Sequence, residues 1–285
     1  RLLGVAVVQL NFWINIRLAS QMSDGSVAGV TFAFMLMLMP QAAIAQSIAT
    51  AAMPTLAAQF ARDALDEVRT SLASSLRGVL LLSIPASLGL ILLRRPIIAL
   101  LYQHGEFTAR STDLVAWALL WYAAGLVGHS VMEVLARAFY ALHDTRTPVL
   151  VGATAMSLNV AFSFAFAALF ERLGWMPHGG LALANSLATA LETIALLVLM
   201  RRRLDRIEER RVLRCGLQAG MAAAAMSVAL WGWLQLGKDF SVWLLAGGGI
   251  ALGGLVYGLV VLLLGVEEVH RGIDILRVRL SRLAN

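Results

Sequence analysis

Charged residues and cysteine are both scarce in this chain of 285 residues. Only 14% of the residues are charged, whereas an average soluble domain has about 25%. Most of the protein surface must therefore face something other than water, as it does in a membrane protein. The single cysteine, Cys215, excludes an internal disulfide bond, and a lone thiol without a histidine partner gives no sign of a nucleophile.

The sequence also lacks the motifs of common enzyme classes, such as HExxH, GxSxG and the phosphate-binding P-loop. Asp63, Asp66 and Glu67 could suggest a metal-diphosphate site. They lie beside Arg62 and Arg69 in an amphipathic stretch, however, and we interpret them as a solvated face. The sequence thus predicts a protein that is not an enzyme, and it indicates no metal and no cofactor.

Long apolar runs dominate the rest of the chain, and apolar residues make up 59% of it. Eight runs approach the length of about 20 residues that a helix needs to cross a bilayer. They cover residues 2–19, 27–50, 79–93, 114–136, 149–170, 180–200, 215–235 and 242–264. The third run is short and contains Pro85, but residues 72–78 can extend it. The runs predict an all-α fold, a polytopic membrane helical bundle with about eight spans.

Three amphipathic stretches lie between or after these spans. Residues 55–77 place apolar side chains on one face, and they predict a helix along the membrane surface that links the second and third spans. Residues 94–107 predict a similar helix on the opposite side, and residues 265–285 predict a short amphipathic tail. Within the second span, Pro40 removes a hydrogen bond and should bend the helix. The bend could serve a conformational change or could simply be tolerated.

The distribution of lysine and arginine predicts the orientation. Most loop cations fall on the side that holds Asp144, the arginine-rich segment 201–214 and the C-terminus. The positive-inside rule places that side in the cytoplasm. The arginines lie in loops at the ends of spans and are not mixed with aromatic residues on a soluble face, so anionic membrane lipids rather than nucleic acid are the expected partners.

Three segments resemble a known family. They are RAFYALHDTRTPVL at residues 137–150, PTLAAQFARDALDEVRTSL at residues 54–72 and LLYQHGEFTARSTD at residues 100–113. All three are similar to segments of the MurJ (MviN) lipid II flippase family, whose members have two six-span lobes and two additional helices. This resemblance implies that residues 1–204 form the second lobe, residues 205–264 two additional spans and residues 265–285 a cytoplasmic tail. The N-terminal lobe would then be missing, which agrees with a chain that begins at Arg1 without an initiator methionine.

The resemblance also implies a function. Family members move an undecaprenyl-pyrophosphate-linked peptidoglycan precursor across the bacterial inner membrane by alternating access of two lobes around a cationic cavity. The expected role is therefore transport of lipid II in peptidoglycan biosynthesis. Two alternatives stay open: export of another polyprenyl-linked oligosaccharide or of a drug in exchange for cations, and a membrane scaffold that transports nothing.

Ionisable residues inside spans are costly and are therefore candidates for substrate binding. His129, Glu133 and Arg137 recur every four residues and share one helix face, so Glu133 and Arg137 can pair. Arg137 could reach a pyrophosphate from a cavity, or the pair could neutralise itself between packed helices. His129 and Glu133 are weaker candidates on the same face.

Arg17 is a further substrate-binding candidate, near the outer end of the first span. Family members usually carry an Asp-Arg pair on the second of these spans, but Phe34 and Met35 occupy those positions here. Arg17 could replace the missing charge, or its long side chain could simply reach the outer head groups.

Four neutral polar residues within the spans form a possible cation site: Asn15, Asn159, Ser163 and Asn185. A good sodium site usually includes a carboxylate. Hydrogen bonds between helices are therefore the favoured interpretation. Glu192 is the one nearby carboxylate that could assist a cation.

The resemblance gives structural roles to two further regions. In the turn at residues 144–148, Asp144 can cap the following helix and Pro148 suits its first turn, with Arg146 between them. In the last two spans, the family implies a groove for the lipid tail. The glycines at 247, 248, 249, 253 and 254 should permit close packing there.

Overall fold

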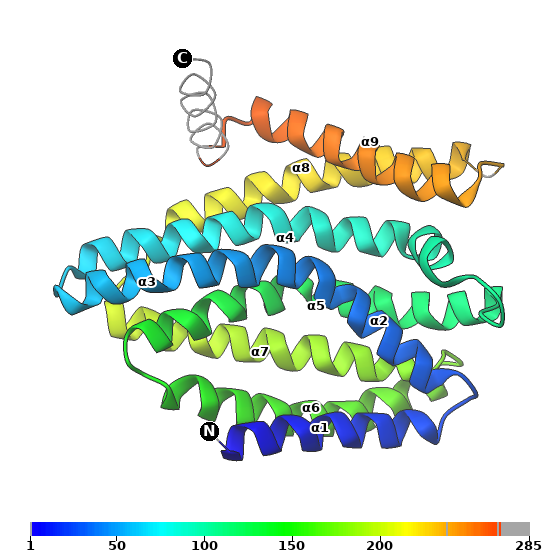
Figure 1. Ribbon diagram of the computed structural model, residues 1–285, viewed down its shortest axis with the longest axis horizontal. Coiled ribbons are helices and arrows are strands. Elements are labelled where there is room, and N and C mark those ends of the chain that lie inside the picture. The colour runs from blue at the N-terminus through cyan, green and yellow to red at the C-terminus, as the bar shows by residue number, and fades with distance from the viewer. Residues whose placement is uncertain (1, 238, 267, 269–285) are drawn as a thin grey trace.

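The computed structural model describes residues 2–237, 239–266 and 268. Its elements are α1 (Leu2–Ser20), α2 (Ser26–Gln41), the π-helical turn η1 (Ala42–Gln46), α3 (Ser47–Ala61), α4 (Leu65–Tyr102), α5 (Ala109–Ala141), α6 (Arg146–Arg172), α7 (His178–Leu204), α8 (Glu209–Leu236) and α9 (Val242–Leu263). The helices lie side by side in a bundle, and consecutive helices run in opposite directions except where α2 continues through η1 into α3 (Figure 1).

Seven helical segments in the described part of the chain are long and apolar enough to cross a membrane. One of them is the continuous helix of residues 26–61, which joins α2, η1 and α3. The 19-residue helix α1 packs beside them on α6. The described residues thus form eight helices when α2, η1 and α3 are counted as one, and the predicted all-α membrane bundle is confirmed.

The bend predicted at Pro40 is present. Proline has no N–H to donate to a carbonyl one turn earlier, and the regular α-helical pattern changes to the π-helical turn at residues 42–46, directly after Pro40. Figure 1 shows the chain changing direction between α2 and α3. The helix then continues to Ala61, beyond the predicted end at residue 50.

The predicted interfacial helix at residues 55–77 is wrong. The stretch is divided between the end of α3 and the start of α4, and Asp63, with a φ of 57°, lies in the turn between them. Val68, Leu72 and Leu76 gave the stretch its amphipathic pattern, and they are buried in a core cluster with side chains of α5 and α7. The apolar face therefore packs on protein instead of lying on lipid.

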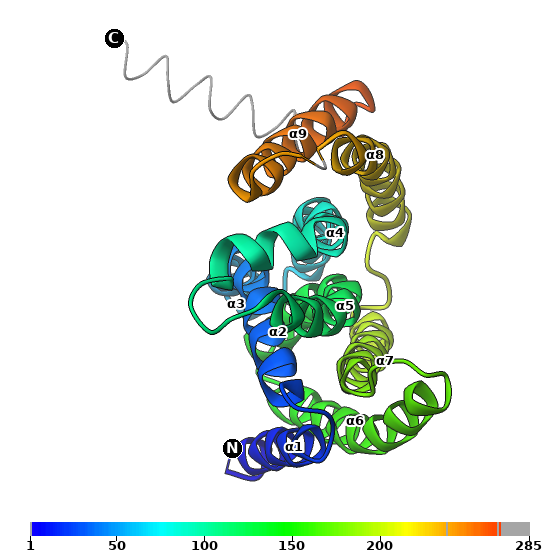
Figure 2. The same cartoon turned by 90° about the vertical axis from the view of Figure 1, so that its right-hand side faces the viewer.

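The helix α4 has 38 residues and contains the third predicted span together with residues 72–78. Residues 94–107 do not form a separate helix, which corrects the second interfacial prediction. They complete α4 as far as Tyr102 and then form a turn. Figure 2 shows the end of α4 turned away from the line of the helix, and Pro96 in this segment accounts for such a kink.

Helix α5 lies at the centre of the first six spans and packs on α2, α4 and α7, while α6 joins α1 to α7 (Figure 2). Glycine makes the contact between α5 and α7 possible. A Cβ atom at Gly125 would lie 2.3 Å from Oγ of Ser186, which itself donates to the carbonyl oxygen of Trp121 at 2.8 Å. The two helix backbones can therefore approach closely.

Helices α8 and α9 pack on each other and on α4 (Figures 1 and 2). Gly249 admits the side chain of Leu93 from α4, and Gly253 faces Leu230 of α8, which confirms close packing at these positions. Glycines 247 and 254 face open space instead. Of the predicted tail at residues 265–285, all but residues 265, 266 and 268 lie outside the described residues.

Candidate functional site

A cavity of about 450 Å³ lies between α1, α2, α5, α6 and α7. Its volume is in the range of about 300–1,000 Å³ that is typical of small-molecule sites. The apolar lining consists of Phe12, Ile16, Ala19, Val27, Val30, Phe34, Met35, Leu38, Met132, Ala155, Met156 and Ala188. The polar lining consists of Asn11, Asn15, Thr31, Tyr122, His129, Asn159, Asn185, Thr189 and Glu192.

The charges of this cavity do not suit a pyrophosphate. Neither arginine nor lysine is among the described residues that line it, and Glu192 is its one carboxylate. Recognition of phosphate oxygens relies on arginine, lysine or arrays of N–H donors. The arginines proposed from the sequence as substrate ligands, Arg17 and Arg137, therefore lie outside this cavity and act elsewhere if they bind substrate.

The three ionisable candidate residues of α5 lie in two different environments. His129 lines the cavity, and its Nε2 donates to Oδ1 of Asn185 on α7 at 3.0 Å. Glu133 and Arg137 do not line it. They form the predicted ion pair, with 2.9 Å between Nε of Arg137 and Oε1 of Glu133. The Arg137 side chain keeps an exposed fraction of 33%, so the pair is only partly buried.

Arg17 lies near the end of α1 with an exposed side chain, and the described residues offer it no ion-pair partner. Phe34 and Met35 line the cavity on α2. The Phe34 ring lies 5.3 Å from that of Tyr122 on α5. An aromatic contact therefore occupies this position on α2, while Arg17, the one cation in α1, is exposed.

Three of the four candidate cation ligands form a hydrogen-bond network between α1 and α6. Oδ1 of Asn159 accepts from Nδ2 of Asn15 at 3.1 Å, and the Ser163 hydroxyl lies between Oδ1 of Asn15 at 3.0 Å and Oδ1 of Asn159 at 3.4 Å. Asn11, which was not singled out from the sequence, donates to the same oxygen at 3.1 Å. Asn185 is not part of this network because it pairs with His129. The Asn159 oxygen is saturated by amide and hydroxyl donors, as expected for interhelical hydrogen bonds rather than for a cation ligand.

The turn between α5 and α6 has the predicted capping arrangement. Oδ1 of Asp144 accepts from the backbone N–H of Thr147 at 3.0 Å, and Pro148 is buried in the first turn of α6. Arg203 at the end of α7 reaches across to Oδ2 of Asp144 at 2.6 Å. The Thr147 N–H and hydroxyl, with Arg203, lower the pKa of the Asp144 carboxyl below its usual value. Arg146 is exposed.

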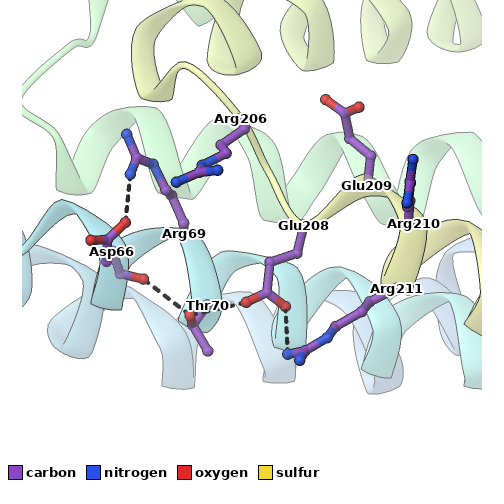
Figure 3. A pocket seen from close by; sticks show the side chains of 8 residues that line it. All are labelled: Asp66, Arg69, Thr70, Arg206, Glu208, Glu209, Arg210 and Arg211. Atoms are coloured by element: carbon purple, nitrogen blue, oxygen red, sulfur yellow. Dashed lines mark hydrogen bonds and ion pairs between the residues drawn. The ribbon is translucent and has the colours of Figure 1, made fainter.

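A second hollow, of about 570 Å³, lies between the start of α4 and the segment that joins α7 to α8 (Figure 3). Its arginines are interleaved with acids. Arg69 pairs with Asp66 at 2.5 Å, and Arg211 pairs with Glu208 at 3.2 Å. Most charge in this hollow is therefore neutralised locally, in agreement with the acids that are interspersed among the arginines of residues 201–211.

Arg77 differs most from its expected environment. It ends the stretch 55–77 that was predicted to lie along the membrane surface, but it is part of α4 and has an exposed fraction of only 3%. It pairs with Glu208 before α8 at 3.4 Å and with Glu268 after α9. This buried ionic cluster ties the last two helices to α4.

The family model of the lipid II flippase MurJ matches residues 1–247. The probable lipid II flippase MurJ of Haemophilus influenzae is 29% identical and covers 94% of this chain and 54% of its own length. The corresponding protein of Vibrio cholerae is 32% identical, over 67% of this chain and 35% of its own length. The lipid II flippase MurJ of Burkholderia cenocepacia is 30% identical, over 70% of this chain and 38% of its own length. The chain thus spans about half the length, or less, of these relatives.

Two solved structures share the fold. Lipid II flippase MurJ in an inward closed conformation superposes with a TM-score of 0.76 at 23% identity, over 90% of this chain and 51% of that one. A transporter of the MOP superfamily from Pyrococcus furiosus gives a TM-score of 0.61 at 17% identity, over 90% of this chain and 59% of that one. Because the family model matches most of its length, this chain belongs to the MurJ lipid II flippase family.

Proposed function

We propose that this chain is the second lobe and the following two spans of a protein that flips lipid II across the bacterial inner membrane. The match to the flippase family over residues 1–247 carries the proposal. In this assignment residues 1–204 form the lobe, residues 205–264 form the additional spans, and residues 265–285 form a cytoplasmic tail. An N-terminal lobe is the partner against which this one rocks, so that a central site opens to either side in turn.

The positions of the basic residues support an orientation. The α5–α6 turn, the α7–α8 segment and the end of α9 lie at the same end of the bundle (Figure 1). This end carries Arg146 and the arginines of residues 201–214. The positive-inside rule then places it, and the C-terminus, in the cytoplasm.

The pyrophosphate and the undecaprenyl tail of the lipid bind to different parts of the chain. Arg17, near the outer end of α1, and Arg137, near the cytoplasmic end of α5, contact the pyrophosphate at different stages of its passage along the face between the lobes, with Glu133 holding Arg137. Helices α8 and α9 accept the undecaprenyl tail. Large apolar side chains that face outward on α8 and α9, such as Trp231, Leu255 and Leu259, support this assignment.

Rescue of a bacterial strain depleted of its own flippase tests the function. The full-length gene should restore growth and rod shape, and purified full-length protein in liposomes should move labelled lipid II between leaflets. Neither rescue nor movement of lipid II would contradict the proposal. Movement of a different polyprenyl-linked oligosaccharide would assign the alternative cargo, and exchange of a drug for sodium or protons would assign a drug exporter.

Substitutions at Arg17 test its role in that assay. Arg17→Ala should abolish rescue without lowering the amount of protein in the membrane, whereas Arg17→Lys should rescue partly because lysine keeps the charge but not the bidentate geometry. Adding Met35→Arg to Arg17→Ala should recover some function, since it returns a cation to the usual family position. If Arg17→Ala rescues like the parent, the residue only reaches the head groups.

A further inference from the structure

We infer that the cavity between α1, α2, α5, α6 and α7 binds a hydrophobic organic monocation, with Glu192 as its counter-ion. The cavity lies within one lobe, so this inference does not depend on the proposed transport of lipid II.

Most polar groups in the lining of the cavity already have partners. Asn11, Asn15 and Asn159 hydrogen-bond to one another, and His129 pairs with Asn185. Glu192 is the one carboxylate in the lining, and no ion pair or side-chain hydrogen bond joins it to another described residue. It lies close to the bare backbone of α6, where a Cβ at Gly152 would be 3.1 Å from its Oε1. A carboxylate inside a membrane bundle is costly when no opposite charge accompanies it.

The side chains that line the cavity indicate which kind of cation fits it. A metal ion needs several hard oxygen ligands, but the described residues contain no group of three His, Cys, Asp or Glu side chains that could hold one. The Asn159 oxygen is already saturated. Most of the lining is instead apolar, and the rings of Phe34 and Tyr122 can receive a cation on their faces. A large apolar cation matches the volume, the apolar walls and the single negative charge together.

Methyltriphenylphosphonium is a suitable probe, and triphenylphosphine oxide is its uncharged analogue of nearly the same shape. Calorimetric titration of the purified full-length protein in detergent should show saturable binding of one phosphonium ion and much weaker binding of the oxide. Glu192→Gln removes the charge with almost no change of shape and should weaken phosphonium binding at least about tenfold, while it leaves binding of the oxide unchanged.

Two further variants complete the test. Glu171→Gln neutralises an exposed carboxylate at the end of α6 and should bind the phosphonium like the parent. Ala155→Phe fills the cavity from α6 and should weaken binding of both probes. Equal phosphonium affinity of the parent and Glu192→Gln would overturn the inference, as would equal affinity of the parent for the two probes or no binding at all. A Glu192 carboxyl group that simply takes up a proton gives the first of these results, because it is then uncharged like glutamine.

Discussion

Two arginines within the helices, Arg137 and Arg77, lie close to opposite charges, whereas Arg17 and Glu192 have no ion-pair partner among the described residues. Arg137 is paired with Glu133 one turn earlier on α5, and Arg77 is paired with Glu208 and Glu268. A charge inside a membrane protein is costly unless it is paired and hydrogen-bonded. Pairing explains how these residues are tolerated. It also means that removing one partner leaves the other charge unpaired and destabilises the protein.

The pair on α5 gives a prediction that distinguishes coupling from independent roles. Glu133→Gln should reduce rescue by the full-length protein, because it leaves Arg137 without its partner 2.9 Å away. Arg137→Gln in addition should restore the amount of folded protein to near the parental level. The measurement is the double-mutant cycle of membrane abundance and thermal unfolding. Additive effects of the two substitutions would show that the residues do not stabilise each other.

The turn at Asp144 gives a prediction that depends on pH. Asp144→Ala should lower the free energy of unfolding by about 1–2 kcal/mol, because it removes both the helix cap and the contact with Arg203. Asp144→Asn keeps the cap, since asparagine is an equally good capping residue, and loses only the charge.

The pKa of Asp144 is lowered in the folded protein, so its charge stabilises the fold above the ordinary aspartate pKa of about 3.9. This stabilisation disappears as the pH falls through the lower pKa of the folded state. Thermal unfolding in detergent should therefore show a difference between the parent and Asp144→Asn at pH 7 that shrinks below about pH 4. A difference that is independent of pH would contradict the pairing with Arg203.

The site residues that could be predicted from the sequence are those whose contacts are local. The spacing of Glu133 and Arg137 predicts their ion pair because residues four apart meet on a helix. The partners of Arg77 lie far along the chain, beyond several further spans, and no local pattern connects them. Asn11 could have been found, since it lies one turn before Asn15 on the same helix face. The Arg203 contact could not, because it depends on how α7 packs beside the turn.

At the scale of helices, composition predicted the spans, but it did not predict what their apolar faces touch. Lipid and protein interiors both select apolar side chains, so Val68 and Leu72 carried the same signal whether they faced a membrane surface or a core. Proline was a clearer guide. Pro40 accompanies the predicted bend, which takes the form of a π-helical turn, whereas α4 continues through Pro85.

Because α5 and α7 pack closely, a methyl group added at their contact should destabilise the fold. Gly125→Ala should lower the free energy of unfolding by about 1–3 kcal/mol, because the new Cβ would lie 2.3 Å from Oγ of Ser186 and overpack the α5–α7 contact. Gly220→Ala on α8 is the matched control, since no atom lies within 4 Å of its added Cβ. Thermal unfolding in detergent should show that the control is as stable as the parent or more stable. Equal effects of the two variants would mean that α5 and α7 are not in close contact.

At the scale of the whole molecule, the fold predicts which loops share a side of the membrane. Cys215 is replaced by serine, and single cysteines are introduced at the exposed positions Ser23, Thr145, Arg202 and Ser241. Reagents that cannot cross the membrane should label positions 23 and 241 in intact cells, and positions 145 and 202 only after the cells are opened. Labelling of 145 or 202 in intact cells would reverse the proposed orientation.

The attachment of α8 and α9 to α4 constrains how these two helices can move. These two helices pack mainly on α4, Tyr257 of α9 donates to the carbonyl oxygen of Leu81, and Arg77 joins α4 to the segments before α8 and after α9. At 1.5 Å per residue the 38 residues of α4 span about 57 Å, long enough to transmit a small tilt from one membrane face to the other. If the lobe rocks as proposed, α4 is the described helix that sets the direction in which α8 and α9 move. A lipid chain held against them would be steered by a single helix, independently of the α1 and α6 side of the lobe.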